Sequence, residues 1–209
     1  MLEDKGCPAQ LSIKYNNKSN RATVFLRLLL ALPILTILIL LLEAHLAQSN
    51  NANTNVMQIG GGFLFFPIML MIVFRQKYPK WWFDWICELV KFSCRIAAYM
   101  MMLTDKYPST DKEQDVKISL KYPNVKEDLN RYLPLIKWLL AIPHFLILSV
   151  LGVAVLLLLP IVWLIILMIG RMPKKLFNFL VGLMRYSLRV SAYSVLLITD
   201  KYPSFSWKE

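Results

Sequence analysis

Two basic side chains lie inside long apolar stretches, where a charge could take part in chemistry. Arg27 follows Arg21 by six residues and Lys137 follows Arg131 by six, each among Leu, Ile, Val and Ala. A charge within a membrane helix is a candidate functional group by default. Six helical residues rise only about 9 Å, so both cations are also within reach of lipid headgroups. We therefore expect Arg27 and Lys137 to contact headgroups or a partner protein.

The other reactive side chains predict no reaction. The only histidines are His45 and His144, and a haem held by both would need them at one depth on facing helices. His45 is expected near the end of its helix and His144 near the middle of its own, which argues against haem. The three cysteines form no CxxC motif, and the sequence contains no nucleotide, zinc-protease or serine-hydrolase motif. We expect no enzyme activity, no cofactor and no metal site.

The composition is typical of a membrane protein. Of the 209 residues, 57% are hydrophobic and 18% are charged. Between Arg131 and Arg171 the only charged side chain is Lys137. One helix over this stretch would be about 60 Å long, twice the thickness of the hydrocarbon core of a bilayer. A turn near Ser149 and Gly152 would divide it into two spans of about 19 residues each. The alternative is a buried helical hairpin of a soluble protein, which rarely hides so long an uncharged run.

The sequence consists of two similar halves. A shift of 110 residues places NRATVFLRLLLALP, from Asn20, on NRYLPLIKWLLAIP, from Asn130. A shift of 94 places Tyr99 on Tyr193, and TDKYPS closes both halves. The difference of 16 residues corresponds to an Asn-rich segment of the first half, Glu43–Gln58. We therefore predict a tandem duplication, with repeat one at residues 10–109 and repeat two at residues 116–206.

Each repeat is expected to begin with a strand and to continue with two spans. Leu11, Ile13 and Tyr15 alternate with polar residues, and the same alternation runs from Val116 to Tyr122. Because an isolated strand is barely stable, we expect the two strands to pair with each other as a small cytoplasmic sheet. The spans are expected at about residues 21–44, 57–74, 131–148 and 153–169.

A third helix in each repeat is predicted to be amphipathic. These helices are expected at Lys80–Leu103 and Lys174–Ile198, with one polar stripe and an opposite face of aromatic and aliphatic residues. That pattern is typical of a helix lying in the plane of the membrane interface. The basic residues of the two stripes are Lys91, Arg95, Arg185 and Arg189.

The distribution of Lys and Arg predicts the topology. None of the 24 lies between Arg27 and Arg75 or between Lys137 and Arg171. If the third helices lie flat, all of them fall on one face, as the positive-inside rule prefers. We therefore predict an all-α membrane protein of two parallel repeats, each with two transmembrane helices and one interfacial amphipathic helix, plus the small β-pair. Both termini would be cytoplasmic, and Gln48–Asn55 would face the periplasm. In the alternative, the third helices also span and the repeats are inverted.

The tripeptide KYP occurs four times and supplies further candidate contacts. Proline ends a helix, tyrosine favours the headgroup level and lysine faces anionic phosphate. The motif is either a plain interfacial anchor or a docking site for a headgroup or partner. The complete set of predicted headgroup or partner contacts is Arg27, Lys77, Lys91, Arg95, Lys106, Lys137, Arg185, Arg189 and Lys201. The predicted interfacial anchors are Trp81, Trp82, Trp85, Tyr107 and Tyr202.

Three segments of the second half resemble a known family. They are KWLLAIPH at Lys137–His144, GRMPKKLFNF from Gly170, and SLRVSAYSVLLITDKYP at Ser187–Pro203. They resemble a bacterial integral-membrane family known only as a domain of unknown function, closely over about Leu120–Phe205 and more weakly over repeat one, where Ile34 stands in place of His144. The resemblance implies a bacterial membrane protein with hydrophobic helix pairs and no established activity.

These observations favour a non-enzymatic, multi-pass protein of the bacterial inner membrane. We expect a scaffold or accessory subunit that organises lipid or a membrane complex. The alternatives are transport or lipid handling through a cleft between the repeats, and a membrane enzyme or cofactor subunit. The expected partners are anionic lipids and another membrane protein or a second copy of the chain. Nucleic acid is not expected, because the basic residues punctuate apolar helices instead of forming one stripe.

Overall fold

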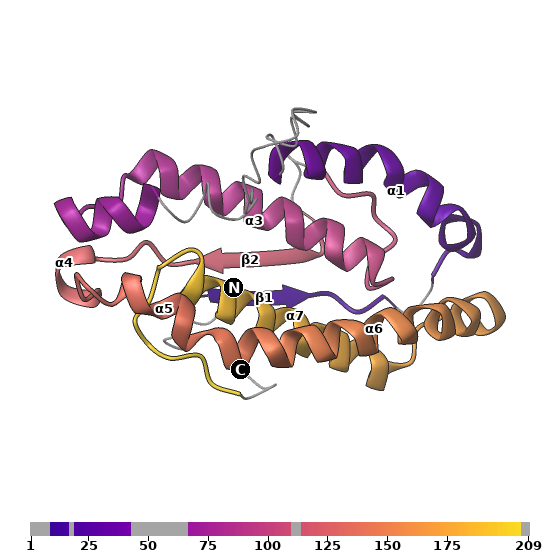
Figure 1. Ribbon diagram of the computed structural model, residues 1–209. Coiled ribbons are helices and arrows are strands. Elements are labelled where there is room, and N and C mark those ends of the chain that lie inside the picture. The colour runs from indigo at the N-terminus through magenta and orange to yellow at the C-terminus, as the bar shows by residue number, and fades with distance from the viewer. Residues whose placement is uncertain (1–8, 17–18, 43–66, 110–113, 206–209) are drawn as a thin grey trace, which may run out of the picture.

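The computed structural model describes residues 9–16, 19–42, 67–109 and 114–205 (Figure 1). Repeat one contains strand β1 (Ala9–Ile13), helix α1 (Arg21–Leu42), a helical segment at residues 67–70 that continues as the π-helix η1 (Met71–Arg75), and helix α3 (Lys80–Met100). Repeat two contains strand β2 (Val116–Leu120), a short helix α4 (Val125–Asp128), and helices α5 (Pro134–Leu140), α6 (Ile142–Ile169) and α7 (Lys174–Ser194).

The two strands pair with each other, as the alternating pattern predicted. β1 and β2 are antiparallel, with Leu11 opposite Ile118 at the centre of the ladder. Helix α7 packs against β1 and α3 packs against β2, so the sheet lies between these helices (Figure 1). Ala9, Leu11 and Ile13 are buried while their neighbours in β1 are half-buried, which is the expected result of period-two alternation.

The third helices begin where they were predicted to begin. Pro79 and Pro173 precede α3 and α7 in an extended conformation, which fixes the start of each helix at the following lysine. Helix α3 buries one face. Helix α7 differs from the expected interfacial helix, because the five consecutive residues from Leu180 to Met184 are all buried. The reason is tertiary: β1 packs on one side of α7, and α5 and α6 pack on another.

The predicted turn near Ser149 and Gly152 is wrong. Both residues lie inside α6, a single helix of 28 residues that is about 42 Å long. The Ser149 hydroxyl donates a hydrogen bond to the Leu146 carbonyl oxygen, 2.8 Å away, so it is satisfied within the helix. Gly152 has no positive φ, and a single helical glycine costs only about 1 kcal/mol. Neither residue is a strong enough signal to end so apolar a helix.

Helix α6 leaves most of its apolar surface uncovered. In the part of the chain that the structure describes, it is the one helix long and apolar enough to cross a membrane, and only 17% of its most apolar window is buried. Large apolar side chains on α1 are exposed as well, among them Phe25, Leu29 and Leu32. The predicted periplasmic loop and most of the second span of repeat one lie outside the described residues.

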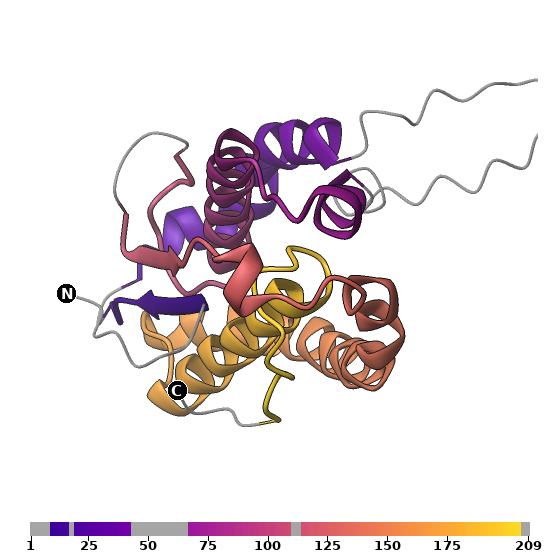
Figure 2. The ribbon, with the colours of Figure 1, turned by 90° about the vertical axis from the view of Figure 1, so that its left-hand side faces the viewer.

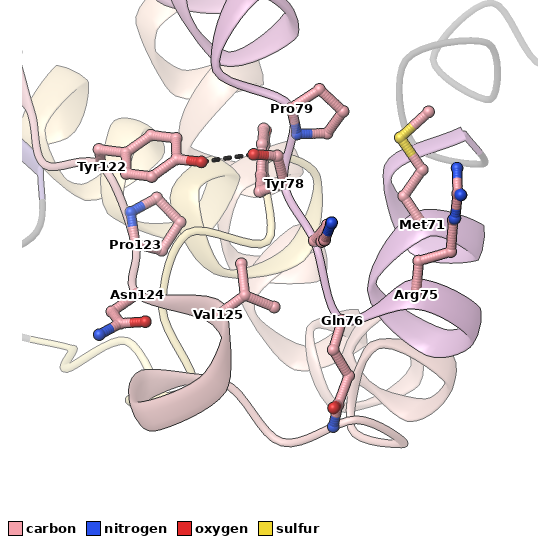
Figure 3. Close-up of a pocket in the computed structure, with 10 residues that line it drawn as sticks. Met71, Arg75, Gln76, Tyr78, Pro79, Tyr122, Pro123, Asn124 and Val125 are labelled. Atoms are coloured by element: carbon pink, nitrogen blue, oxygen red, sulfur yellow. Dashed lines mark hydrogen bonds between the residues drawn. The ribbon is translucent and has the colours of Figure 1, made fainter.

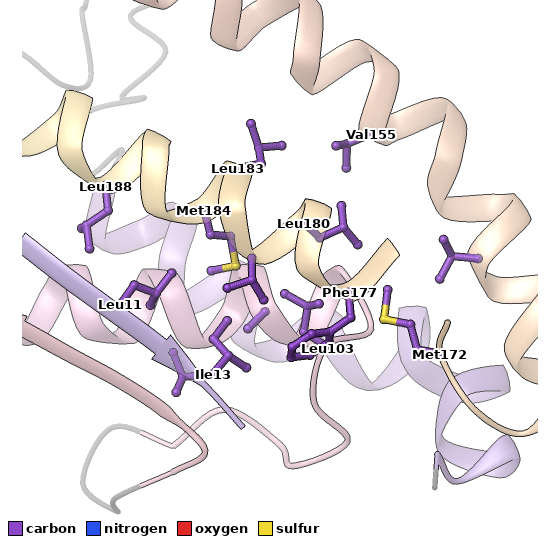
Figure 4. Packing of buried hydrophobic residues seen from close by; sticks show 14 of the residues in the cluster. Leu11, Ile13, Leu103, Val155, Met172, Phe177, Leu180, Leu183, Met184 and Leu188 are labelled. Carbon is purple, nitrogen blue, oxygen red and sulfur yellow. The ribbon is translucent and has the colours of Figure 1, made fainter. Parts of the chain in front are cut away.

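The largest core lies between the sheet, α7 and α6 (Figure 4). Leu11 and Ile13 from β1 meet Phe177 and Leu180 from α7, and Val155 reaches the same cluster from α6. Viewed along the helices, the sheet lies to one side of α3 and α7, and α5 and α6 lie to the other (Figure 2). The uncovered apolar surface of α6 therefore lies on the side of the molecule away from the sheet.

Candidate functional site

The first candidate site surrounds Arg27, which α1 carries into the interior. Its side chain is only 2% exposed. The Nη2 atom forms an ion pair with Asp105 Oδ1 at 2.7 Å, and Nη1 donates to the Tyr99 carbonyl oxygen at 2.6 Å. The guanidinium carbon lies 4.6 Å from the centre of the Tyr99 ring, within cation–π range. The charge is therefore neutralised by α3 and by the segment that follows it.

Lys137 occupies the matching position in repeat two and is 0% exposed. Its Nζ forms an ion pair with Asp200 Oδ1 at 2.6 Å and donates to the Thr199 carbonyl oxygen at 2.8 Å. The ammonium lies 5.2 Å from the centre of the Tyr193 ring. Each contact of Arg27 thus has a counterpart here: a carboxylate, a carbonyl oxygen and a tyrosine ring.

Each aspartate also holds the beginning of the apolar helix. Asp105 Oδ2 accepts a hydrogen bond from the Asn20 backbone N–H at 3.1 Å, just before α1. Asp200 Oδ2 accepts one from the Asn130 N–H at 2.5 Å. Each carboxylate therefore bridges a helix start and a buried cation, and fastens the TDKYP segment to the apolar helix.

These two sites are suited to holding structure, not to catalysis. Each contains one acid and one base that neutralise each other, and no nucleophile stands beside them. Within the described residues no three His, Cys, Asp or Glu side chains lie close enough to hold a metal ion. Removing one partner of a buried ion pair costs on the order of 3–5 kcal/mol, because an uncompensated charge remains.

A third set of contacts runs crosswise between the halves. The Tyr15 hydroxyl donates to the Met172 carbonyl oxygen at 2.6 Å, and the Tyr122 hydroxyl donates to the Tyr78 carbonyl oxygen. The sequence alignment that equates the two halves places Met172 on Tyr78. Each half therefore anchors the segment before the third helix of the other half.

The two conserved helix-start arginines also reach across. Arg21 Nη2 donates to the Met168 carbonyl oxygen at 3.2 Å, and Arg131 Nε donates to the Val73 carbonyl oxygen at 2.6 Å. The start of α1 thus lies beside the end of α6, and the segment before α5 lies beside η1.

A pocket of about 570 Å³ opens on one side of this crosswise arrangement (Figure 3). Residues 71–79 of repeat one form one wall and residues 122–125 of repeat two form the other. Arg75 and Lys77 bring positive charge to it. Burial raises the pKa of the Tyr78 phenol well above its usual range, so this wall stays neutral.

The predicted contact residues are placed as follows. Arg27 and Lys137 are buried and paired with carboxylates, so they do not extend to headgroups as predicted. Arg185 Nε donates to the Leu11 carbonyl oxygen at 2.9 Å, and Arg189 Nη1 donates to Ser204 Oγ at 3.2 Å, so both are half-buried against protein and their stripe does not face water. Arg95 Nη1 donates to the Ser109 carbonyl oxygen at 2.6 Å.

The remaining cations are more exposed. Lys91 pairs with Glu88 at 2.7 Å and Lys106 pairs with Asp115 at 2.9 Å. Lys77 lines the pocket, and Lys201 is exposed beyond α7. A headgroup or partner contact by these four stays a prediction.

The predicted aromatic anchors form two kinds of environment. Trp81 and Trp85 are exposed and flank the half-buried Trp82, with ring centres 5.3 and 5.7 Å from it. Tyr107 packs its edge against Tyr99, and Tyr202 packs against Tyr193. The two tyrosines are exposed, but they also cover the buried cation sites.

Sequence reasoning missed the partners of the two cations. Asp105 and Asp200 both stand in TDKYPS, the one acidic residue that this repeated word contains. A basic residue in an apolar helix and an acidic residue in a shared word, repeated together in both halves, was the available signal. His144 was also missed as a packing residue: it is buried, and its Nδ1 lies 2.6 Å from the Tyr186 hydroxyl.

Residues 134–206 match the family model described as a domain of unknown function (DUF4389). The matched segment contains α5, α6, α7 and the TDKYP segment with Asp200, and so includes the whole Lys137 site. This agrees with the resemblance to an uncharacterised family found in the second half. No curated protein and no solved structure matches the chain.

Proposed function

We propose that this chain is a non-enzymatic protein of the bacterial inner membrane, a scaffold or accessory subunit that organises lipid or a membrane complex. It would be a tandem duplication whose halves embed apolar helices in the membrane and keep both termini in the cytoplasm. Repeat one would cross the membrane as a helix pair, which makes the protein multi-pass. Anionic lipid, and a membrane protein or second copy of the chain, are the proposed partners.

The observation that carries the proposal is the uncovered surface of α6. Its most apolar window is only 17% buried, whereas the core helix of a soluble protein is mostly buried. Contiguous exposed apolar surface of this extent marks a contact with membrane or protein. Together with the exposed apolar residues of α1, it supports lipid as the surrounding medium.

The ends of α6 favour a particular placement. Arg131 and Lys137 precede the helix, and Arg171 and Lys174 follow it, so the positive-inside rule prefers both ends on the cytoplasmic face. A continuous helix that crosses once would separate them. We therefore propose that α5 and α6 lie along the cytoplasmic leaflet, with the apolar face in lipid and the α7 side toward the sheet. This replaces the predicted hairpin of repeat two.

Membrane extraction tests the first part of the proposal. The full chain should stay in the membrane pellet after alkaline carbonate treatment, since burying the α1 and α6 surfaces in lipid is strongly favourable. Release into the supernatant would reject membrane embedding.

Cysteine labelling tests the placement of α6. In a chain whose native cysteines are replaced, Lys121→Cys and Lys175→Cys mark the two sides of α5–α6, and both positions are exposed. An impermeant reagent should label neither in intact cells and both in inverted vesicles. Labelling of only one in intact cells would show that α6 crosses. Asn53→Cys, in the predicted periplasmic loop, should be labelled in intact cells.

Lipid handling is the second candidate, and the pocket between the halves favours it. A lipid-handling protein should accelerate the movement of a fluorescent lipid between leaflets after reconstitution. A scaffold should leave that rate at the level of empty vesicles. Isolation of the complex with a partner in fixed stoichiometry would favour the scaffold, and a haem absorbance band would favour a cofactor subunit.

A further inference from the structure

The pocket between residues 71–79 and 122–125 carries more positive charge than its surroundings neutralise. Arg75 and Lys77 line it, and both are exposed. Among the described residues no carboxylate lies within ion-pair distance of either. Other cations of the chain behave differently, since Arg27, Lys91 and Lys137 all have an acidic partner. Two uncompensated cations at the mouth of a pocket favour an anionic ligand.

The acidic groups near the pocket do not cancel this charge. Glu127 Oε2 accepts a hydrogen bond from Asn124 Nδ2 at 2.6 Å, and Asp128 Oδ2 accepts one from the Asn124 backbone N–H at 3.2 Å. Both carboxylates are exposed on α4. They hold Asn124, which lines the pocket, in place while the two cations stay available on the opposite wall.

The pocket is specific to one side of the molecule. The equivalent space, beside Tyr15 and Met172, has no room for a water molecule. There the Ser19 N–H donates to the Gly170 carbonyl oxygen at 3.0 Å, and Arg21 packs over Gly170 with Nε 3.4 Å from where a Cβ would lie. Where that side has Ile169 and Gly170, the open side has Arg75 and Gln76.

A difference in connector length explains the opening. Four residues, 16–19, join Tyr15 to Asn20, whereas seven residues, 123–129, join Tyr122 to Asn130. The additional residues form α4, which directs the connector around the pocket instead of across it. Figure 3 shows Tyr122 to Val125 on one side of the space and Met71 with Arg75 on the other.

The remaining lining selects among anions. Met71, Pro79, Pro123 and Val125 give the pocket apolar walls between its charged and polar groups. A free inorganic anion gains nothing from such walls, whereas the glycerol and first acyl carbons of a lipid do. The pocket also lies at the end of the predicted second span of repeat one, at the expected headgroup level.

We propose that this pocket binds the phosphate-bearing anionic headgroup of a membrane lipid, with Arg75 and Lys77 as its cations. The proposal rests on the membrane function proposed above and gives it a ligand. Asn124 and Gln76 supply uncharged polar groups, and the apolar walls receive the glycerol end of the acyl chains.

The test is a titration of the full chain, in uncharged detergent, with short-chain phosphatidylglycerol. Arg75→Gln combined with Lys77→Gln should weaken binding by about tenfold or more, because each cation near such a headgroup contributes about 1 kcal/mol. The matched control is Arg171→Gln combined with Lys175→Gln. It removes the same charge from exposed positions on the closed side and should change affinity less than about twofold.

A second variant tests shape instead of charge. Asn124→Trp fills the pocket from an exposed position and leaves the net charge unchanged, so it should also weaken binding while the unfolding temperature stays the same. Equal losses in the pocket and control double variants would show that only overall charge matters and would overturn the proposal. Unchanged binding in Asn124→Trp would do the same.

Soluble anions separate the two sources of phosphate. Glycerol phosphate and inorganic phosphate should bind much more weakly than phosphatidylglycerol. If inorganic phosphate binds equally well, the ligand is a free phosphate and the lipid assignment is overturned. Failure of the membrane function is a separate result, because carbonate would then release the chain whatever this titration shows.

Discussion

Arg27 and Asp105 are 78 residues apart in the chain, yet their charged groups lie 2.7 Å apart. Lys137 and Asp200 stand in the same relation in the second half, at 2.6 Å. In both cases a cation from an apolar helix meets a carboxylate from the segment after the third helix. The contact joins the first and last elements of a half, so it should report on the integrity of that half as a whole.

Asp105→Asn should strongly destabilise the protein. It leaves Arg27 buried without a counter-charge, and because Asp105 itself is 18% exposed we expect a loss near the lower end of the usual range, about 3 kcal/mol. Denaturant unfolding in detergent measures it. Glu88→Gln is the control, since its pair with Lys91 is solvent-exposed and should contribute less than about 1 kcal/mol. Equal effects of the two changes would contradict a buried pair.

The pair in the second half should show strong coupling in a double-mutant cycle. Lys137→Met and Asp200→Asn should each destabilise, and the double variant should recover about 1–3 kcal/mol of the summed loss, because no unpaired charge remains. The same cycle on Lys106 and Asp115, an exposed pair, should recover less than about 0.5 kcal/mol. Strict additivity at Lys137 and Asp200 would mean that the two do not interact.

Two glycines should respond to the same substitution with opposite signs. Gly152→Ala should stabilise α6 by up to about 1 kcal/mol, because the position is helical and nothing lies within 4 Å of the new Cβ. Gly170→Ala should destabilise by about 1–2 kcal/mol, because its φ of 77° is left-handed and Arg21 lies 3.4 Å from the new Cβ. Thermal unfolding compares them. Destabilisation by Gly152→Ala would favour the turn that the structure lacks.

Cys94 should react slowly with alkylating reagents. Burial raises the pKa of its thiol to about 11, so near pH 8 only about one thiol in a thousand is the reactive thiolate. In a chain with Cys7→Ser and Cys87→Ala, the alkylation rate should rise about tenfold per pH unit from pH 8 to about 10. Mass spectrometry follows the reaction, and the denatured chain is the control. A rate at pH 8 equal to that of the denatured chain would contradict the burial.

The elements that follow from short patterns were predictable. Period-two alternation located both strands, and a proline followed by a polar stripe located the starts of α3 and α7. These signals are local, because each depends on residues within one or two helical turns. The matching of the two strands also followed, since an isolated strand has no other way to satisfy its backbone.

The positions that failed depend on longer distances or on small energies. The burial of α7 depends on β1, α5 and α6 packing around it, which its own pattern does not encode. The length of α6 depends on Ser149 and Gly152 being weak helix breakers in an apolar sequence, a difference of about 1 kcal/mol. Asp105 and Asp200 lie far along the chain from their cations, so only the joint repetition of acid and base pointed to them.

The pairing of Leu11 with Ile118 has a consequence for the two halves as separate molecules. The alignment of Tyr15 with Tyr122 also equates Leu11 with Ile118, so the central pair of the ladder joins equivalent residues. An antiparallel ladder centred in this way can be made equally well by two identical strands related by a two-fold axis. Either half expressed alone would expose the same strand edge, and it should close that edge with a second copy of itself. Mixing the two halves should then exchange subunits, with each homodimer giving way to a non-covalent copy of the intact chain.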